Sequence, residues 1–109
     1  MREDIVYIEH ILKAIDKIHA YSEGMSQSDF RDNELAQDAI IRNIEIIGES
    51  TKNISKDLKD KYFKIPWKSM AGMRDKLIHD YMGVDIDVIW KTIEQDIPFL
   101  ESLIKEIVA

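Results

Sequence analysis

The sequence contains no cysteine, and it has only four glycines and two prolines among 109 residues. The absence of cysteine excludes disulfide bonds, thiolate catalysis and cysteine-ligated zinc, and it fits a reducing compartment. No apolar run approaches the roughly 20 residues of a membrane helix. The charged first residues, MREDIVYIEH, do not read as a signal peptide. We therefore expect a cytoplasmic protein that makes no use of a membrane.

Hydrophobic residues make up 45% of the chain and charged residues 33%, which predicts a folded globular protein with a single domain over residues 1–109. The net charge of -6 argues against a general nucleic-acid binder. The charge is uneven, however. Between Lys52 and Lys76, eight basic and three acidic residues give a net +5, whereas the rest of the chain carries -11. This basic segment either is a solvated helix end and loop or contacts a polyanion.

Apolar residues recur at helical spacing in the first half of the chain. A first helix is expected over residues 4–23, ended by Gly24, and the stretch GMSQSDFRDN is expected to form a polar turn. Asp32 or Asn33 then caps a second helix that runs to roughly Leu58. Its expected apolar side consists of Leu35, Ala39, Ile40, Ile44, Ile47, Thr51, Ile54 and Leu58.

Prolines divide the second half. Pro66 suits the first turn of a third helix that closes near Gly83. A fourth helix opens at DID, and Pro98 is expected to kink or restart it before residues 99–108. Trp67 and Trp90 are interpreted as core or dimer contacts rather than platforms for RNA bases. Because no strand-type alternation is present, we predict an all-α four- to five-helix bundle.

The stretch RDKLIHDYMG places Arg74, Asp75 and His79 near the end of the third helix. Arg74 and His79 lie about 140° apart around a helix, whereas Asp75 and His79 share one face. The chemistry that these residues suggest is phosphate chemistry. Arg74 would bind a phosphate as a fixed charge, His79 would transfer a proton near neutral pH, and Asp75 would orient the imidazole.

The acidic residues of the second helix offer a structural alternative. Arg74 could pair with Glu45 or Glu49, which would leave His79 as an ordinary surface residue. Arg42 shares a helical face with both glutamates. We interpret Arg42, Glu45 and Glu49 as a network that supports the site.

Other candidates for chemistry are explained better by structure. Asp85 and Asp87 form a D-x-D pair at the start of the fourth helix, where capping and the helix dipole account for them without a metal. His10 and His19 have no cluster of ligands around them and are expected to pack at the core edge or the surface. We therefore expect no metal site.

Three segments together carry a family resemblance: IRNIEIIGES (41–50), IPWKSMAGMRDKLIHDYMGVD (65–85) and VIWKTIEQDIP (88–98). They resemble the HepT-like branch of the HEPN superfamily, the toxin subunits of HepT/MNT toxin-antitoxin pairs, over essentially the whole chain. The signature R-x-x-x-x-H-x-Y is present as Arg74, His79 and Tyr81. The resemblance implies an antiparallel HEPN bundle that forms a homodimer and acts as an endoribonuclease without metal or cofactor.

The resemblance also implies residue roles. His79 would assist attack of a ribose 2′-OH on the adjacent phosphate or protonate the leaving oxygen, and Arg74 would stabilise the developing charge. Tyr81 would receive AMP from an MNT-type minimal nucleotidyltransferase antitoxin, which blocks the site with bulky anionic phosphates. Otherwise Tyr81 is an aromatic anchor at a helix end.

Two expectations concern partners. RNA contacts are expected from Lys64, Lys68 and Lys76, which lie in the basic segment around the motif. The alternative function is a non-catalytic helical interaction module that binds a partner nucleotidyltransferase.

Overall fold

The computed structural model describes the backbone of residues 2–79 and 85–109, and the side chains of residues 3–73 and 85–109. Its elements are α1 (Arg2–Ser22), α2 (Gln27–Arg31), α3 (Glu34–Lys52), α4 (Lys56–Lys61), α5 (Trp67–His79), α6 (Ile86–Lys91), the π-helical segment η2 (Thr92–Asp96) and α7 (Ile97–Val108). Every element in these ranges is helical, which confirms the all-α class. None of the described helices is both long enough and apolar enough to cross a membrane.

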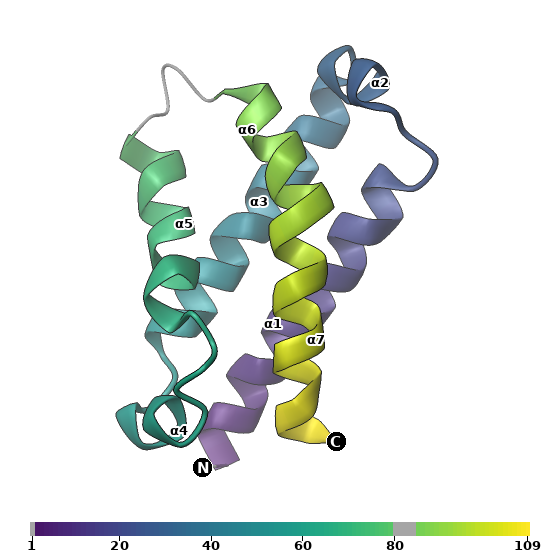
Figure 1. Ribbon diagram of the computed structural model, residues 1–109. Helices are drawn as coiled ribbons and strands as arrows, with labels where there is room; N and C mark the ends of the chain where they lie inside the picture. Colours follow the sequence, from purple (N-terminus) through teal and green to yellow (C-terminus); the bar gives the residue numbers. More distant parts are fainter. Residues whose placement is uncertain (1, 80–84) are drawn as a thin grey trace.

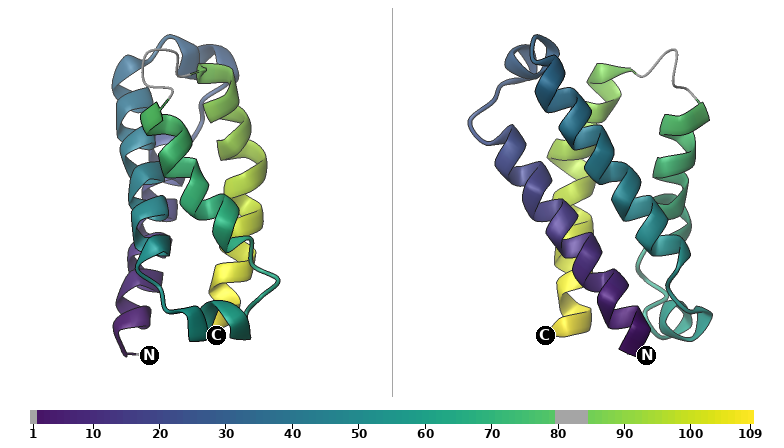
Figure 2. Two further views of the ribbon diagram at one scale, coloured as in Figure 1. Left: turned by 90° about the vertical axis from the view of Figure 1, so that its left-hand side faces the viewer. Right: turned by 180° about the vertical axis from the view of Figure 1, so that it is seen from behind.

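Four long helical segments run along the length of the bundle: α1, α3, α5 and the continuous run of α6, η2 and α7 (Figure 1). α3 lies between α1 and α5, and α7 packs against α1 (Figure 2). Successive segments run in opposite directions, as predicted. The short helices α2 and α4 lie at opposite ends of the bundle, and α4 is at the end that holds both termini.

Isoleucine supplies much of the core. Ile8, Ile11 and Ile15 of α1 have no exposed surface, and Ile44 and Ile47 of α3 are at most 1% exposed. A branched side chain lowers helix propensity by up to about 0.7 kcal/mol, but burying an isoleucine contributes about 1.5–3 kcal/mol. Packing therefore outweighs propensity, and α1 and α3 are held mainly by the core that they share.

The predicted boundary between the first two long helices is confirmed. Gly24 follows α1 with a φ of 75°, a conformation that glycine adopts without steric cost. Asn33 caps α3, because its side-chain oxygen accepts a hydrogen bond from the backbone N–H of Ala36 at 3.0 Å. The expected apolar side was wrong at Leu35, which is 82% exposed. Leu35 is turned about 100° from the buried Ala36, which puts it on the solvent side.

The polar stretch expected to be a turn contains the short helix α2. Ser26 and Asp29 form a capping box, in which each side chain accepts a hydrogen bond from the backbone N–H of the other. Phe30 is fully buried and its ring centroid lies 5.4 Å from that of Trp90. Burial of this single aromatic residue gives α2 a tertiary anchor that a polar turn would lack.

The second long helix ends earlier than predicted. α3 stops at Lys52, and α4 forms a separate helix, so the prediction of one helix to roughly Leu58 was wrong. Ser55 caps α4 by accepting a hydrogen bond from the backbone N–H of Leu58 at 3.2 Å. The Asp4 carboxylate holds Ser55 in turn. It accepts a hydrogen bond from the backbone N–H of Ser55 at 2.8 Å and another from its hydroxyl at 2.6 Å. A partner 51 residues away therefore holds the residue that caps α4.

Both prolines act as expected. Pro66 immediately precedes α5, and Pro98 lies in the first turn of α7, directly after the π-helical segment. Proline cannot donate to the preceding turn and crowds it, which is consistent with the widened helix just before it. Trp67 and Trp90 are each 8% exposed, which confirms that they are core residues.

Asp4 is the buried carboxylate that fixes the start of α1 to the α3–α4 corner, with 4% of its surface exposed. Burial by itself raises the pKa of this carboxyl. The hydrogen bonds from the hydroxyl and the backbone N–H of Ser55 outweigh burial, so the pKa is lowered from its usual value of 3.8. The charged form of Asp4 therefore stabilises the fold.

We predict that Asp4→Asn lowers the free energy of unfolding at pH 7 by about 1–3 kcal/mol, because an amide nitrogen cannot accept the hydroxyl hydrogen bond. The contribution of Asp4 is full above its unfolded pKa of about 3.9 and is lost as pH falls through its lower folded pKa. Urea denaturation at pH 7 and at decreasing pH measures both effects. The control is Asp57→Asn at an exposed position of α4. Equal stability of Asp4→Asn and wild type at pH 7 would contradict the prediction.

Candidate active site

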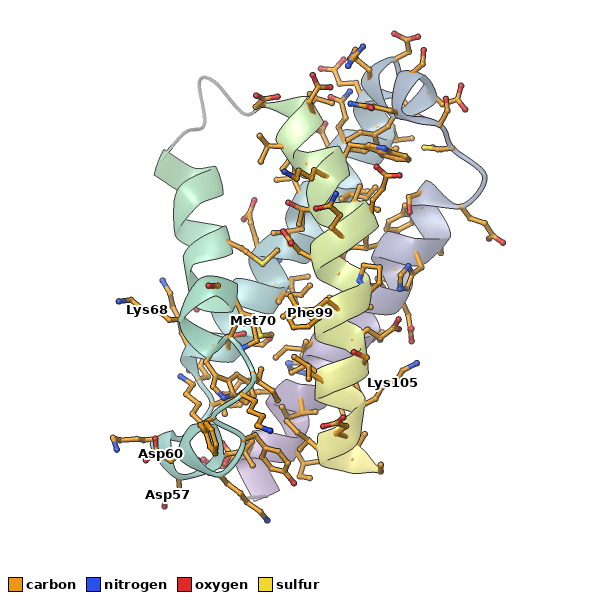
Figure 3. The ribbon with its side chains drawn as sticks, viewed as in Figure 1. Asp57, Asp60, Lys68, Met70, Phe99 and Lys105 are labelled. Atoms are coloured by element: carbon orange, nitrogen blue, oxygen red, sulfur yellow. The ribbon has the colours of Figure 1, made fainter. Side chains whose placement is uncertain are left out.

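α5 carries the Arg/His motif and is anchored at its beginning. Trp67 is 8% exposed and Met70 is fully buried, and α5 packs along α3. The indole N–H of Trp67 donates a hydrogen bond to the backbone oxygen of Tyr62 at 3.0 Å. Met70 points toward the bundle interior, whereas Lys68 points away from it (Figure 3). This pattern fixes which side of α5 faces the core.

The helical backbone of α5 extends through both motif positions. Position 74 lies seven residues after Trp67 and thus within about 20° of that buried residue around the helix. Position 79 lies eleven residues after Lys68 and within about 20° of that exposed residue. Position 74 therefore shares the helical register of Trp67, and position 79, the last residue of α5, shares the register of Lys68.

The structure describes only part of the rest of the motif. Asp75 lies four residues before His79 in the same continuous helix, which is the register that the predicted pairing requires. The structure does not describe the side chains of Arg74, Asp75, Lys76 and His79, so the pairing of Asp75 with His79 stays a prediction. Tyr81 lies outside the described residues.

Glu45 and Glu49 line a surface hollow of about 410 Å³ on the α1 side of α3. Tyr7 and His10 of α1 border the same hollow, together with Arg42 of α3. Glu45 is half-buried and Glu49 is exposed. The hollow brings together Arg42, Glu45 and Glu49, as their shared helical face suggested. α3 separates α1 from α5 in the bundle, so support of the motif by these acids stays a prediction (Figure 2).

After residues 80–84, the described structure resumes at Asp85. Its carboxylate caps α6 by accepting a hydrogen bond from the backbone N–H of Asp87 at 2.9 Å, which confirms the capping interpretation. Asp87 itself accepts hydrogen bonds from Arg31 at 2.6 Å and from Gln27 at 3.1 Å. The bond from Arg31, aided by Gln27, lowers the pKa of Asp87. No local sequence pattern indicates this contact between α6 and α2.

The two other histidines pack at the edge of the structure, as predicted. Nε2 of His19 lies 3.1 Å from a carboxylate oxygen of Glu101 on α7. His10 is exposed, and its ring meets that of Tyr7 edge-on with centroids 6.0 Å apart. Neither contact suggests catalysis.

Exposed cations gather where α4 leads into α5. Lys64 lies in the connecting loop and Lys68 in the first turns of α5, and both side chains are exposed. Lys61 is also exposed, with its ammonium 5.6 Å from the centroid of the Tyr62 ring. Phe63, which lies between Lys61 and Lys64 in the sequence, is 75% exposed. Sequence reasoning missed Phe63, although the alternation of lysine and aromatic residues in KYFK could have indicated it.

Comparison with known proteins assigns the family. The sequence model of the ribonuclease HepT-like family matches residues 11–107. A protein of Thermococcus cleftensis named "Probable ribonuclease HepT" is 48% identical over 96 residues, which cover 88% of this chain and 87% of that protein. A protein of Caldanaerobacter subterraneus subsp. tengcongensis with a provisional RNase name is 46% identical over 101 residues, which cover 93% of this chain and 90% of that protein.

A longer protein of Methanocaldococcus jannaschii, whose name joins a gamma-glutamylcyclotransferase to a provisional RNase, is 44% identical over 108 residues. The match covers 98% of this chain but 49% of that protein, so the chain spans about half the length of this relative. No solved structure matches the chain. The family match over most of the sequence, together with a motif of arginine and histidine on one helix, shows that the chain belongs to the HepT-like ribonuclease family.

Proposed function

We propose that the chain is the endoribonuclease toxin of a two-gene HepT/MNT pair and that it cleaves RNA without a metal ion in a cleft formed by two copies. One observation carries the proposal: Arg74 and His79 lie on one continuous helix, α5, in a chain that belongs to the HepT-like ribonuclease family. The anchoring of α5 by Trp67 and Met70 supports it, because a catalytic pair needs a rigid support.

The chemistry is a phosphodiester transfer within RNA. The ribose 2′-oxygen attacks the adjacent phosphorus, its proton passes to an imidazole, and the bond from phosphorus to the 5′-oxygen breaks. The leaving 5′-oxygen takes up a proton, which leaves a 2′,3′-cyclic phosphate and a 5′-hydroxyl. His79 serves as the proton-transfer group, Arg74 stabilises the charge on the phosphoryl oxygens, and Asp75 orients the imidazole.

The register of α5 favours a site shared between two chains. Positions 74 and 79 lie on opposite sides of α5, about 140° apart, so one chain is poorly arranged to bring both groups to one phosphate. A twofold dimer places two motif copies around one cleft, and Arg74 of one protomer can then act with His79 of its partner.

Substrate RNA would approach along the basic segment. Lys64 and Lys68 are exposed near the start of the motif helix, and Lys76 is a further position on that helix. Lysine contacts to phosphates are mostly independent of base sequence. These residues therefore account for attraction of RNA and not for the choice of cleavage site.

A minimal nucleotidyltransferase antitoxin would inhibit the toxin by modifying Tyr81. Transfer of AMP from ATP to the phenol oxygen would release pyrophosphate and attach an anionic nucleotide two residues after His79. The added phosphate repels the RNA backbone, and the nucleotide fills space that the substrate needs.

The rival function is a non-catalytic helical module that binds a nucleotidyltransferase partner. The net charge of -6 favours it, because an acidic protein repels RNA at long range. The exposed Lys64 and Lys68 weigh against it locally. The two functions separate in a cleavage assay.

We predict that wild-type protein cleaves a mixed RNA pool in EDTA and leaves 2′,3′-cyclic phosphate ends. His79→Ala should slow cleavage about 10²- to 10⁴-fold by removing proton transfer, and Arg74→Ala should slow it about 10²- to 10³-fold by removing charge stabilisation. Lys105→Ala is the control, because it removes an exposed cation of α7 (Figure 3). Analysis of the 3′ ends identifies the chemistry.

Absence of cleavage by a folded, unmodified dimer across varied RNAs would favour the interaction module. Cleavage that EDTA abolishes would contradict the metal-independent reaction.

We also predict that an MNT-type partner and ATP add AMP to the wild-type chain and stop RNA cleavage. Tyr81→Phe should remain unmodified and keep cleaving in their presence. Intact-protein mass spectrometry detects the addition. Tyr21→Phe is the matched control, since Tyr21 is a tyrosine with 42% of its surface exposed in α1. Modification of Tyr81→Phe to the wild-type extent would exclude Tyr81 as the acceptor.

A further inference from the structure

The loop between α4 and α5 displays an aromatic side chain to solvent. Phe63 is 75% exposed, although phenylalanine is among the residues most often buried in proteins. The other apolar and aromatic residues of the loop are more buried. Tyr62 is half-buried beside Lys61, and Ile65 is 5% exposed. Among the apolar and aromatic residues of this loop, high exposure is therefore specific to Phe63, and the loop does not hang free of the bundle.

Hydrogen bonds hold this loop in one conformation. The backbone oxygen of Tyr62 accepts from the N–H of Ile65 at 3.1 Å and from the indole N–H of Trp67 at 3.0 Å. The backbone N–H of Trp67 donates to the oxygen of Ile65 at 2.8 Å. Since Ile65 and Trp67 are buried, the segment that presents Phe63 is anchored on both sides. A preorganised aromatic surface loses little conformational entropy when it binds a ligand.

A hollow of about 370 Å³ adjoins the exposed ring. It is lined by residues 61–65 and, from α7, by Leu103 and Glu106. The Glu106 carboxylate disfavours a phosphate in the hollow, but it can accept hydrogen bonds from the exocyclic amino group of a base. The apolar residues of the lining suit a nucleobase, and Lys61 and Lys64, which also line the hollow, can contact the phosphates on either side of that base.

The charge around the ring is positive. Residues 61–68 contain Lys61, Lys64 and Lys68 and no acidic residue, in a chain whose net charge is -6. Among the described residues, neither Lys64 nor Lys68 has a carboxylate within ion-pair distance, whereas Lys56 is bonded to Asp60 at 2.8 Å. The unpaired ammonium groups remain available for phosphates.

We propose that Lys61, Phe63, Lys64 and Lys68 form a stacking platform for single-stranded RNA, in which a base stacks on Phe63 and the lysines contact the flanking phosphates. The proposal rests on the ribonuclease function and adds a substrate-binding site outside the motif. Exposed aromatic rings among cations are the usual elements of single-strand recognition. Duplex RNA offers no free base face. Protein interfaces are depleted in lysine, which makes a protein partner a poorer match.

The platform lies at the opposite end of α5 from His79. α5 rises by about 18 Å from residue 67 to residue 79, at about 1.5 Å per residue. Lys68 points outward at the start of this path, on the stripe that position 79 shares (Figure 3). A strand held at Phe63 can therefore follow the outward face of α5 and reach the motif a few nucleotides later.

The test measures binding of a short, fluorescein-labelled single-stranded RNA by anisotropy, with 2′-O-methyl groups that prevent cleavage. We expect Phe63→Ala to weaken binding about 5- to 150-fold, the loss that corresponds to one stacked base, and Phe63→Trp to keep it. Phe99→Ala, which removes a phenylalanine that is 57% exposed on α7, should bind like wild type. Lys64→Gln should reduce the salt slope by about 0.7.

Three outcomes would overturn the proposal. The first is wild-type affinity in Phe63→Ala, and the second is an equal loss for single-stranded RNA and duplex RNA of the same sequence. The third is unchanged RNA binding together with lost binding of the nucleotidyltransferase partner, which would make Phe63 a protein contact. Failure of Phe63→Trp to restore binding would assign the effect of Phe63→Ala to folding and not to stacking.

Cleavage separates this proposal from the function on which it rests. If the protein is a ribonuclease, Phe63→Ala should raise KM for long single-stranded RNA more than it lowers kcat. If wild type cleaves no RNA, the proposed function fails, and binding of uncleavable RNA that depends on Phe63 would still support the platform. Cleavage with the wild-type KM in Phe63→Ala would contradict the platform and leave the catalytic motif intact.

Discussion

The packing of α5 against α3 is the constraint on which the site depends. Trp67 and Met70 bury one stripe of α5, and the indole hydrogen bond to Tyr62 fixes the helix at its first residue. Because a helix is stiff over its length, this anchor sets the direction of every later position. It gives position 74 the helical register of Trp67 and position 79 the register of Lys68. A change of register by one residue would turn both positions by about 100° around the helix axis and so change what each of them faces.

Much of the fold could be predicted from local signals. Gly24 and Asn33 end and begin helices through their own backbone and side-chain chemistry, so the sequence alone identifies both. The failures came from partners far away in the sequence. Phe30 looked like part of a polar turn because its burial depends on α6. Ser55 looked like the interior of a helix because its role as the N-cap of α4 is supported by Asp4, a residue far away in the sequence.

The sequence suggests which residues form the site but not how they are arranged. Spacing alone left Arg74 and His79 open to a structural interpretation. The family match assigns the chain to the HepT-like ribonucleases, and the catalytic roles of the two residues stay a prediction. Whether Glu45 and Glu49 support the motif depends on how α1, α3 and α5 meet, which no local pattern encodes. Phe63 was missed for the opposite reason. Hydrophobic periodicity treats a phenylalanine as a core residue, and only the packed structure shows one left in solvent among lysines.

The central claim is that Arg74 and His79 act together across two copies of the chain. The most direct test mixes Arg74→Ala and His79→Ala proteins, allows subunits to exchange, and measures RNA cleavage in EDTA. Each variant alone should be inactive. The mixture should recover part of the wild-type rate, because a mixed dimer contains one cleft with an intact arginine from one protomer and an intact histidine from its partner. No recovery, in a mixture shown to have exchanged subunits, would contradict the shared cleft.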